Sequence, residues 1–140
     1  TTFTTRRMRL RDNNVEDKFE YLNTKAGEIA KKAKDLNPYV LIAGGLPPQY
    51  LTYEADTRSD NEIRENFYEQ ARILNPFIDF FYFDVLSSVK EFKLAIEAIK
   101  SFNKPYLVGA HISEGVKLPS GENISDIISK IEHKNLLGLI

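Results

Sequence analysis

The sequence predicts a parallel α/β fold, in which strands and helices alternate along the chain. Short apolar runs recur at residues 39–43, 77–83, 106–111 and 136–140. Such near-continuous runs are typical of strands that are covered on both faces. Longer segments with helical spacing of their apolar residues lie between them. One helix per strand implies right-handed βαβ units and hence a parallel sheet.

The helical segments have clear starts and stops. The first spans residues 15–34 and ends before Pro38, because the residue before a proline is pushed out of the α region. Ser59 and Ser88 each precede a glutamate by three residues, which is the capping-box pattern of a helix start. We expect a last helix to end at Asn135. The predicted inward-facing residues of the four helices include Phe19, Leu22, Ala26, Ile29, Ala30 and Ala33, then Ile63, Phe67, Ala71 and Leu74, then Phe92, Ala95, Ile96, Ile99 and Phe102, and finally Ile124, Ile127, Ile128 and Ile131.

The spacing of the predicted strands resembles a walk around a barrel. Residues 1–5 are β-prone, as the tail of a strand would be, and the chain ends at Ile140 inside an apolar run. We therefore expect residues 1–140 to form one incomplete domain, the central part of a partial (β/α)8 TIM barrel. A small doubly wound α/β sheet also fits, since the alternation alone does not choose between the two.

Composition excludes several classes of protein. Hydrophobic residues make up 42% of the 140 residues, and the formal net charge is −1, so neither disorder nor a nucleic-acid-binding surface is indicated. The only basic cluster, Arg6, Arg7, Arg9 and Arg11, is interpreted as the solvated start of a helix. No membrane span or secretory signal is present, and there is no cysteine. We expect a cytoplasmic protein with no nucleic acid or membrane partner.

Functional candidates gather at the predicted strand ends. Gly44 and Gly45, Asp84 and His111 each follow or close an apolar run, and the carboxyl ends of parallel strands share one edge. Taken singly, each has a plain structural explanation: a turn, a helix cap or a hydrogen-bonded histidine. His133 fits a helix C-terminus, where its charge is favourable. Their convergence predicts a small-molecule site, with no catalytic or metal-ligating residue assigned.

Three segments together resemble the homocysteine S-methyltransferase family, in particular its betaine–homocysteine type. Val40-Leu-Ile-Ala-Gly-Gly45 with the following Leu-Pro-Pro-Gln-Tyr-Leu-Thr52 resembles the third strand of the family barrel. Asp79-Phe-Phe-Tyr-Phe-Asp84 resembles the fourth strand, which ends in an acid that contacts homocysteine. Lys104-Pro105, His111, Gly115 and Pro119-Ser-Gly-Glu122 are similar to the fifth strand and its loop. The resemblance covers nearly the whole chain.

The resemblance implies a methyltransferase that moves a methyl group from an onium-type donor to the zinc-activated thiol of homocysteine, forming methionine. Asp84 would hold homocysteine, although the family acid is usually the longer glutamate, and Gly44, Gly45 and His111 would complete the substrate site. The zinc-binding cysteines would lie outside these 140 residues, so we expect the isolated chain to be inactive. It is also expected to self-associate, with a homo-oligomer possible. The alternatives are a non-catalytic small-molecule-binding barrel homologue and an unrelated α/β binding module.

Overall fold

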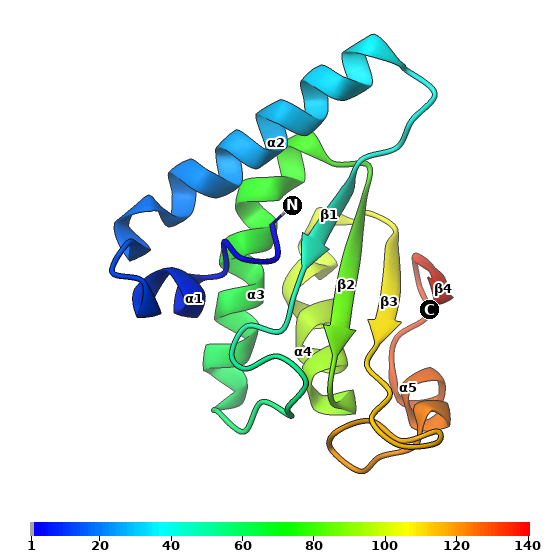
Figure 1. Ribbon diagram of the computed structural model, residues 1–140. Helices are drawn as coiled ribbons and strands as arrows, with labels where there is room; N and C mark the ends of the chain where they lie inside the picture. Colours follow the sequence, from blue (N-terminus) through cyan, green and yellow to red (C-terminus); the bar gives the residue numbers. More distant parts are fainter. Residues whose placement is uncertain (1) are drawn as a thin grey trace.

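The fold is a four-stranded parallel sheet with helices between its strands. The computed structural model describes residues 2–140 (Figure 1). The strands are β1 (Ala43–Leu46), β2 (Phe80–Leu86), β3 (Tyr106–Ala110) and β4 (Leu136–Leu139). The α-helices are α1 (Arg7–Asp12), α2 (Phe19–Leu36), α3 (Asp60–Leu74), α4 (Val89–Ile99) and α5 (Ile124–Lys130). Three single turns of 3₁₀-helix occur at Glu16–Lys18, Asn75–Phe77 and Lys100–Phe102. The predicted α/β alternation is confirmed.

Strand order in the sheet follows the order in the chain. The neighbours run β1-β2-β3-β4, and every pair is parallel. A doubly wound sheet reverses its strand order at a switch point, whereas a barrel adds each strand beside the preceding one. The observed order therefore favours the barrel-type progression over the doubly wound sheet. Within residues 2–140, no helix is both long enough and apolar enough to cross a membrane.

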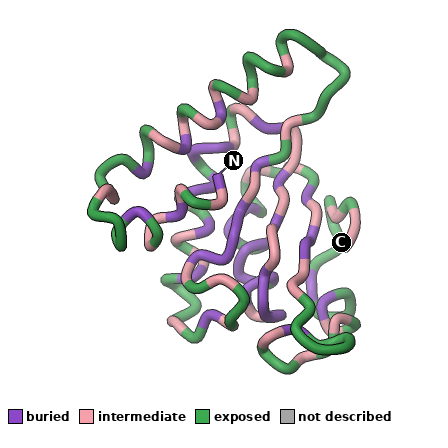
Figure 2. The backbone as a smooth tube through the Cα atoms, in the orientation of Figure 1, coloured by how far each residue is buried: buried purple, intermediate pink, exposed green. Residues whose placement is uncertain are grey.

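The core lies between the sheet and helices α3 and α4, as the purple segments of Figure 2 show. Phe81, Phe83 and Leu86 of β2 are fully buried against these helices. The predicted stripes of α3 and α4 are confirmed, with Phe102 only partly buried. Alternate residues of β2 remain half-buried on the other face of the sheet, because side chains alternate along a strand. One face of β2 thus holds the core together, and the other is free for a ligand.

Helices α3 and α4 begin as predicted. Ser59 accepts a hydrogen bond from the backbone N–H of Glu62, and the Glu62 side chain accepts one in return from the backbone of Ser59. Ser88 accepts from the backbone N–H of Glu91, whereas the Glu91 carboxylate turns to the backbone N–H of Ser87. Both serines therefore satisfy N–H groups that a helix start leaves without partners.

The first strand is not where the sequence placed it. Residues 39–41 are exposed, with Tyr39 94% and Leu41 69% accessible, and β1 begins only at Ala43. Asp79 accounts for the shift. Its carboxylate accepts hydrogen bonds from the Ile42 backbone N–H at 2.6 Å and from Lys34 Nζ at 2.6 Å. These contacts, the Ile42 hydrogen bond first, lower the pKa of Asp79. Residues 39–41, which were expected in a buried strand, instead belong to the connection between α2 and β1, and Asp79 at the start of β2 holds the end of this connection.

The prediction for α2 was also wrong in part. Of its expected inward residues only Phe19 is buried, and Ile29 is 66% exposed. The other buried positions of α2 are Asn23 and Gly27. A Cβ at Gly27 would lie 2.3 Å from Phe77 Cδ2, so this glycine lets α2 pack against the turn before β2. The apolar side of α2 borders a cleft rather than the core.

Three smaller expectations fail as well. Residues 2–5 form turns rather than a strand, and Thr1 lies outside the described residues. Arg6 is buried, at 7% exposure, and is not part of a solvated helix start. Helix α5 ends at Lys130 rather than Asn135, and Ile128 is 40% exposed while Ile127 is buried.

Truncation of Phe83 tests whether one face of β2 forms the core. Phe83→Ala removes a fully buried ring and leaves a cavity, and a loss of about 3–5 kcal/mol in the free energy of unfolding is expected. Chemical denaturation of the full-length protein measures it. The matched control is Tyr39→Ala, whose exposed ring should change stability by less than about 0.5 kcal/mol. Similar losses for both variants would contradict the assignment of the core face.

Candidate functional site

A cleft of about 600 Å³ lies between the sheet, helix α2 and the N-terminal segment. Three of the four predicted site residues, Gly44, Gly45 and Asp84, line it. Its walls are mainly apolar, and they include Phe3, Leu22, Ala26, Ile42, Ile78 and Tyr82. Clefts of this size, mostly apolar with a few polar groups, are typical of small-molecule sites. The cleft is therefore the candidate site.

The two glycines of β1 face opposite sides of the sheet. A Cβ at Gly44 would lie 2.5 Å from Ile78 Cδ1, so Gly44 lets the strand pack closely on that side chain. Gly45 pairs with Tyr82 of β2, and its carbonyl accepts a 2.7 Å hydrogen bond from Thr2 Oγ1. Both glycines lie inside β1 rather than at its exit, which corrects the sequence prediction. Their smallness serves close packing at Gly44 and an open cleft wall at Gly45.

Asp84 lies in an irregular part of β2, two residues before the strand ends. Phe83 pairs with Val108 and Leu86 with Ala110, so β2 uses one residue more than β3 over the same stretch. Val85 takes a positive φ of 51° in this bulge. Bulges often occur beside functional sites because they redirect a side chain. Asp84 is half-buried and lines the cleft, where its carboxylate is open to a ligand.

Tyr82 stands beside Asp84 on the same face of β2. Burial, and then the neighbouring Asp84 carboxylate, raise the pKa of the Tyr82 hydroxyl. The ring of Tyr82 covers Gly109 of β3, where a Cβ would come within 2.9 Å of it. Tyr82 and Asp84 thus form one polar corner of a mainly apolar cleft, which Thr2, Thr5 and Lys25 also line. The sequence analysis treated Tyr82 only as a strand residue and missed this pairing.

His111 lies at the same edge of the sheet but contacts a different partner. It directly follows β3, as predicted, and its backbone N–H donates to the carbonyl of Leu86 at 3.0 Å. Its ring lies 4.5 Å from the ring of Tyr53, centroid to centroid. Tyr53 belongs to the loop between β1 and α3, and it has a positive φ of 69°. His111 does not line the cleft, so the structure groups it with this loop and not with Asp84.

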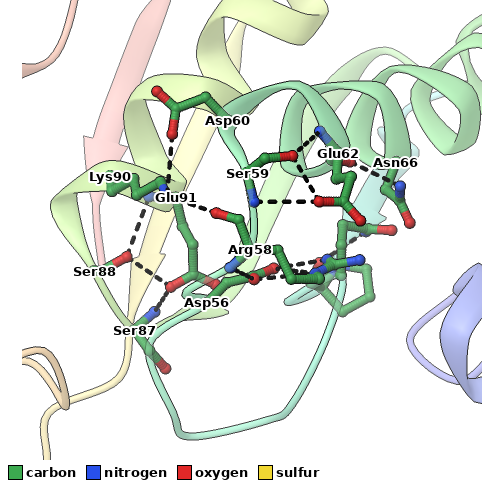
Figure 3. Close-up of polar contacts among 12 residues, drawn as sticks. Asp56, Arg58, Ser59, Asp60, Glu62, Asn66, Ser87, Ser88, Lys90 and Glu91 are labelled. Carbon is green, nitrogen blue, oxygen red and sulfur yellow. Dashed lines mark hydrogen bonds and ion pairs between the residues drawn. The ribbon is translucent and has the colours of Figure 1, made fainter.

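The N-terminus of α4 holds together two loops that follow strands, as the close-up in Figure 3 shows for the first of them. Lys90 Nζ donates to the carbonyl of Arg58 at 2.8 Å and pairs with Asp60 at 3.0 Å, which fixes the loop after β1 (Figure 3). On the other side, Glu122 accepts from the backbone N–H of Val89 at 2.9 Å, which fixes the loop after β3. Both loops border the carboxyl edge of the sheet.

Glu91 is the buried acid of this junction. Only 1% of it is exposed, and its Oε2 accepts a 2.8 Å hydrogen bond from Ser88 Oγ (Figure 3). Its Oε1 has no hydrogen-bond partner among residues 2–140. Burial raises the pKa of Glu91 to about 7; the Ser88 hydrogen bond opposes this shift and the nearby Asp56 carboxylate adds to it. Asp56 is itself buried and paired with Arg58 at 2.7 Å.

The comparisons with known proteins identify the family. The model of the homocysteine S-methyltransferase family matches residues 1–140, the whole chain. The chain belongs to the homocysteine S-methyltransferase family. A comparison with curated proteins returns no significant match.

Among solved structures, the chain is similar to the homocysteine methyltransferase MmuM from Escherichia coli in its apo form. The TM-score is 0.74 at 17% sequence identity, and the match covers 86% of this chain and 48% of the MmuM chain. At this identity the likeness shows the fold. The chain thus spans about half the length of that methyltransferase. Its strands and helices follow one another as they do in a family barrel, in agreement with the predicted fold class.

Family members generally depend on zinc, but this chain does not fit a zinc site. The sequence has no cysteine. His111 follows β3, whereas His133 follows α5 and contacts the carbonyl of Ile128 in the last turn of that helix. No three His, Asp or Glu side chains within residues 2–140 come together as a metal-binding group. The residues of the cleft are suited to holding an organic ligand.

The buried acid makes stability depend on pH. The pKa of Glu91, about 7, lies above its ordinary 4.5. The folded state therefore holds this proton more tightly than the unfolded state, and the resulting stability is fully present below pH 4.5 and is lost as the pH rises through 7. The effect is on the order of 3 kcal/mol. Glu91→Gln keeps a neutral, hydrogen-bonding group, and denaturation at pH 5 and pH 8 should show a smaller stability difference than in the wild type.

The matched control for this experiment is Glu65→Gln on the exposed side of α3. It should retain the wild-type difference between the two pH values. If Glu91→Gln and Glu65→Gln behave alike, the carboxyl group of Glu91 does not titrate as its burial requires.

Proposed function

We propose that this chain is the homocysteine-binding part of a methyltransferase that transfers a methyl group from an onium-type donor to homocysteine, forming methionine. The family match over all 140 residues supports the class of reaction. The position of Asp84 in the cleft supports homocysteine as the substrate, and this observation carries the proposal. We further propose that residues 1–140 are the central βα units of a larger homocysteine-binding barrel.

In this proposal Asp84 binds the α-ammonium group of homocysteine. A carboxylate accepts charge-assisted hydrogen bonds from an ammonium group, and the apolar walls around it strengthen the attraction by excluding water. The bulge at Val85 interrupts the regular pairing of β2 directly after Asp84.

The remaining cleft residues hold and shield the substrate. Gly45 lets the backbone of β1 approach the ligand closely, since no Cβ intervenes, while Gly44 lets β1 pack closely on Ile78. The apolar side of α2, with Leu22 and Ala26, covers the aliphatic part of the amino acid. His111 and Tyr53 fix the loop after β1 above the sheet edge. In the chemical step the homocysteine thiol loses its proton to solvent, and the resulting thiolate forms an S–CH₃ bond as the donor's bond to the same methyl group breaks. The donor leaves without its positive charge.

Removal of the Asp84 carboxylate tests the substrate assignment. In the full-length protein, Asp84→Ala should raise the KM for homocysteine about tenfold or more, because a hydrogen bond to a charged group contributes about 1.5–3 kcal/mol. The KM for the methyl donor should change much less. Asp17→Ala, on the exposed turn before α2, is the control and should leave both constants unchanged. A homocysteine KM within about threefold of the wild type would remove Asp84 from the site.

Metal binding gives a second test. Residues 1–140 alone are expected to bind zinc no more than weakly, because they offer no thiolate and their two histidines lie on different elements. Equilibrium dialysis against zinc, followed by a chelator wash and metal analysis, measures this. His111→Ala and His133→Ala serve as controls for residual binding by single histidines. A stoichiometric zinc that survives the chelator would contradict the expectation.

A further inference from the structure

Gln70 is a buried polar residue on the inward side of α3. Its neighbours on that side, Phe67, Ala71 and Leu74, are all apolar. The Gln70 side chain is as deeply buried as theirs, with 0% exposure. A buried amide is unfavourable unless its donors and its acceptor find partners. The presence of an amide in this apolar stripe is therefore explained by the groups that it holds.

Gln70 joins three segments that lie far apart in the chain. Its Nε2 donates to the carbonyl of Thr2 at 3.0 Å and to Asn23 Oδ1 at 3.1 Å. Its Oε1 accepts a hydrogen bond from Gln49 Nε2 at 3.0 Å. These partners lie 68, 47 and 21 residues away in the sequence, respectively. One side chain thus connects α3 to the N-terminal segment, to α2 and to the loop after β1.

Asn23 completes the same network from α2, and it too is fully buried. Its Nδ2 donates to the carbonyls of Thr5 at 3.0 Å and Phe19 at 2.8 Å, and its Oδ1 accepts from Thr5 Oγ1 at 2.8 Å. With the bond from Gln70, both donors of this amide and both lone pairs of its oxygen are used. We call Asn23, Gln49 and Gln70 the amide cluster.

The amide cluster holds one wall of the candidate cleft. This wall segment, residues 2–5, lies where α2, α3 and β1 meet and forms no helix or strand (Figure 1). Thr2, Phe3 and Thr5 line the cleft, as Asp84 of β2 does. The one backbone–backbone hydrogen bond of this segment within residues 2–140 is long, at 3.4 Å from the Thr5 N–H to the Thr2 carbonyl. Bonds from the cluster to the Thr2 carbonyl and to the carbonyl and hydroxyl of Thr5 therefore determine where the wall lies.

Gln49 connects the loop after β1 to the same cluster. Its side chain is 1% exposed, and its Nε2 also donates at 2.9 Å to the carbonyl of Pro47, which lines the cleft. Its Oε1 is buried and has no hydrogen-bond partner within residues 2–140. The side-chain nitrogen and oxygen atoms of Asn23 and Gln70, by contrast, all have partners. The link to the wall segment is thus better satisfied than the link to the loop.

A preformed wall matters for affinity because a mobile segment must be ordered when a ligand binds. Ordering a loop and its side chains lowers the observed affinity without changing the contacts of the bound ligand. A wall that is fixed before binding avoids this loss. Buried hydrogen-bond networks whose members are satisfied make the elements they join rigid. The amide cluster therefore has the properties that preorganise the cleft.

We propose that Gln70 is a positioning residue of the candidate site, which fixes the wall segment through Thr2 and Asn23 and thereby raises the affinity for the ligand in the cleft. Within the described chain, the lining of the cleft does not include the three amides, so they act through the residues they hold. The identity of the ligand as homocysteine rests on the proposed function. The fixing of the wall segment does not.

Hydrogen exchange detected by mass spectrometry tests the positioning in the full-length protein. Gln70→Met keeps a side chain of similar length and removes all three hydrogen bonds. Exchange should become about fivefold faster or more in the wall segment and in residues 49–52, and stay unchanged in β2, because only the former depend on the network. Gln49→Met breaks the link to the loop alone, so it should speed exchange in residues 49–52 and not in the wall segment.

Calorimetry and steady-state kinetics test the consequence for the ligand. Gln70→Met should weaken homocysteine binding and raise the homocysteine KM by about fivefold or more, with kcat within about twofold of the wild type. Gln49→Met should change the KM far less. Ile63→Val is the matched control, since it removes one buried methyl group from the same side of α3 outside the amide cluster. It should lower stability and leave the KM unchanged.

Asn23→Ser is a second variant, which decides the matter if Gln70→Met does not fold. It removes the bonds from α2 to Thr5 and leaves room for water to satisfy the freed groups, so the fold should be retained. Faster exchange in the wall segment and a higher homocysteine KM are expected again. Unchanged exchange in the wall segment overturns the positioning role. A KM that rises equally in Ile63→Val makes the amide of Gln70 structural only and also overturns the proposal.

The inference and the proposed function fail in different ways. A wild type that binds no homocysteine overturns the proposed function, while faster exchange of the wall segment in Gln70→Met still supports the positioning role. Homocysteine binding that is unchanged in Gln70→Met, despite faster exchange of the wall segment, supports the proposed function and overturns the inference.

Discussion

The start of helix α4 is the constraint on which the site depends. A helix start leaves backbone N–H groups without partners inside the helix. Here Ser88 satisfies the N–H of Glu91, and Glu122 satisfies that of Val89 from the loop after β3. Lys90 reaches the loop after β1 from the same turn. Two loops at the carboxyl edge of the sheet are thus fixed to one helix. This helix follows directly from the strand that carries Asp84.

The side chains of β2 alternate between the hydrophobic core on one face and the candidate site on the other. Phe81 and Phe83 are fully buried beneath the helices, while Tyr82 and Asp84 point to the cleft. The polar corner is therefore built on the most firmly packed strand of the sheet. The bulge after Phe83 changes the register with β3 only beyond this point, so Asp84 keeps the face that alternation gives it and Leu86 returns to the core.

The candidate site was only partly predictable from the sequence. Asp84 and Gly45 stand out because an acid and a glycine interrupt apolar strands, and parallel strands bring such positions to one edge. His111 was assigned to the right edge, but its partner Tyr53 lies 58 residues earlier in a loop that carries no pattern. Arg6 was misread because its neighbours Arg7, Arg9 and Arg11 suggest a solvated segment. Its burial results from contacts with Phe3 and Thr52, and the latter is distant in the chain.

The sequence by itself determined the alternation of strands and helices, the two serine caps and the core stripes of α3 and α4, because these depend on local periodicity and on side chains that reach their own backbone. Only the tertiary structure decided where β1 begins, since a hydrogen bond from Ile42 to Asp79 fixes it across 37 residues. It also decided that the apolar side of α2 borders a cleft and that Glu91 and Arg6 are buried. Burial is set by what packs against a residue from elsewhere in the chain, and no local pattern encodes that neighbour.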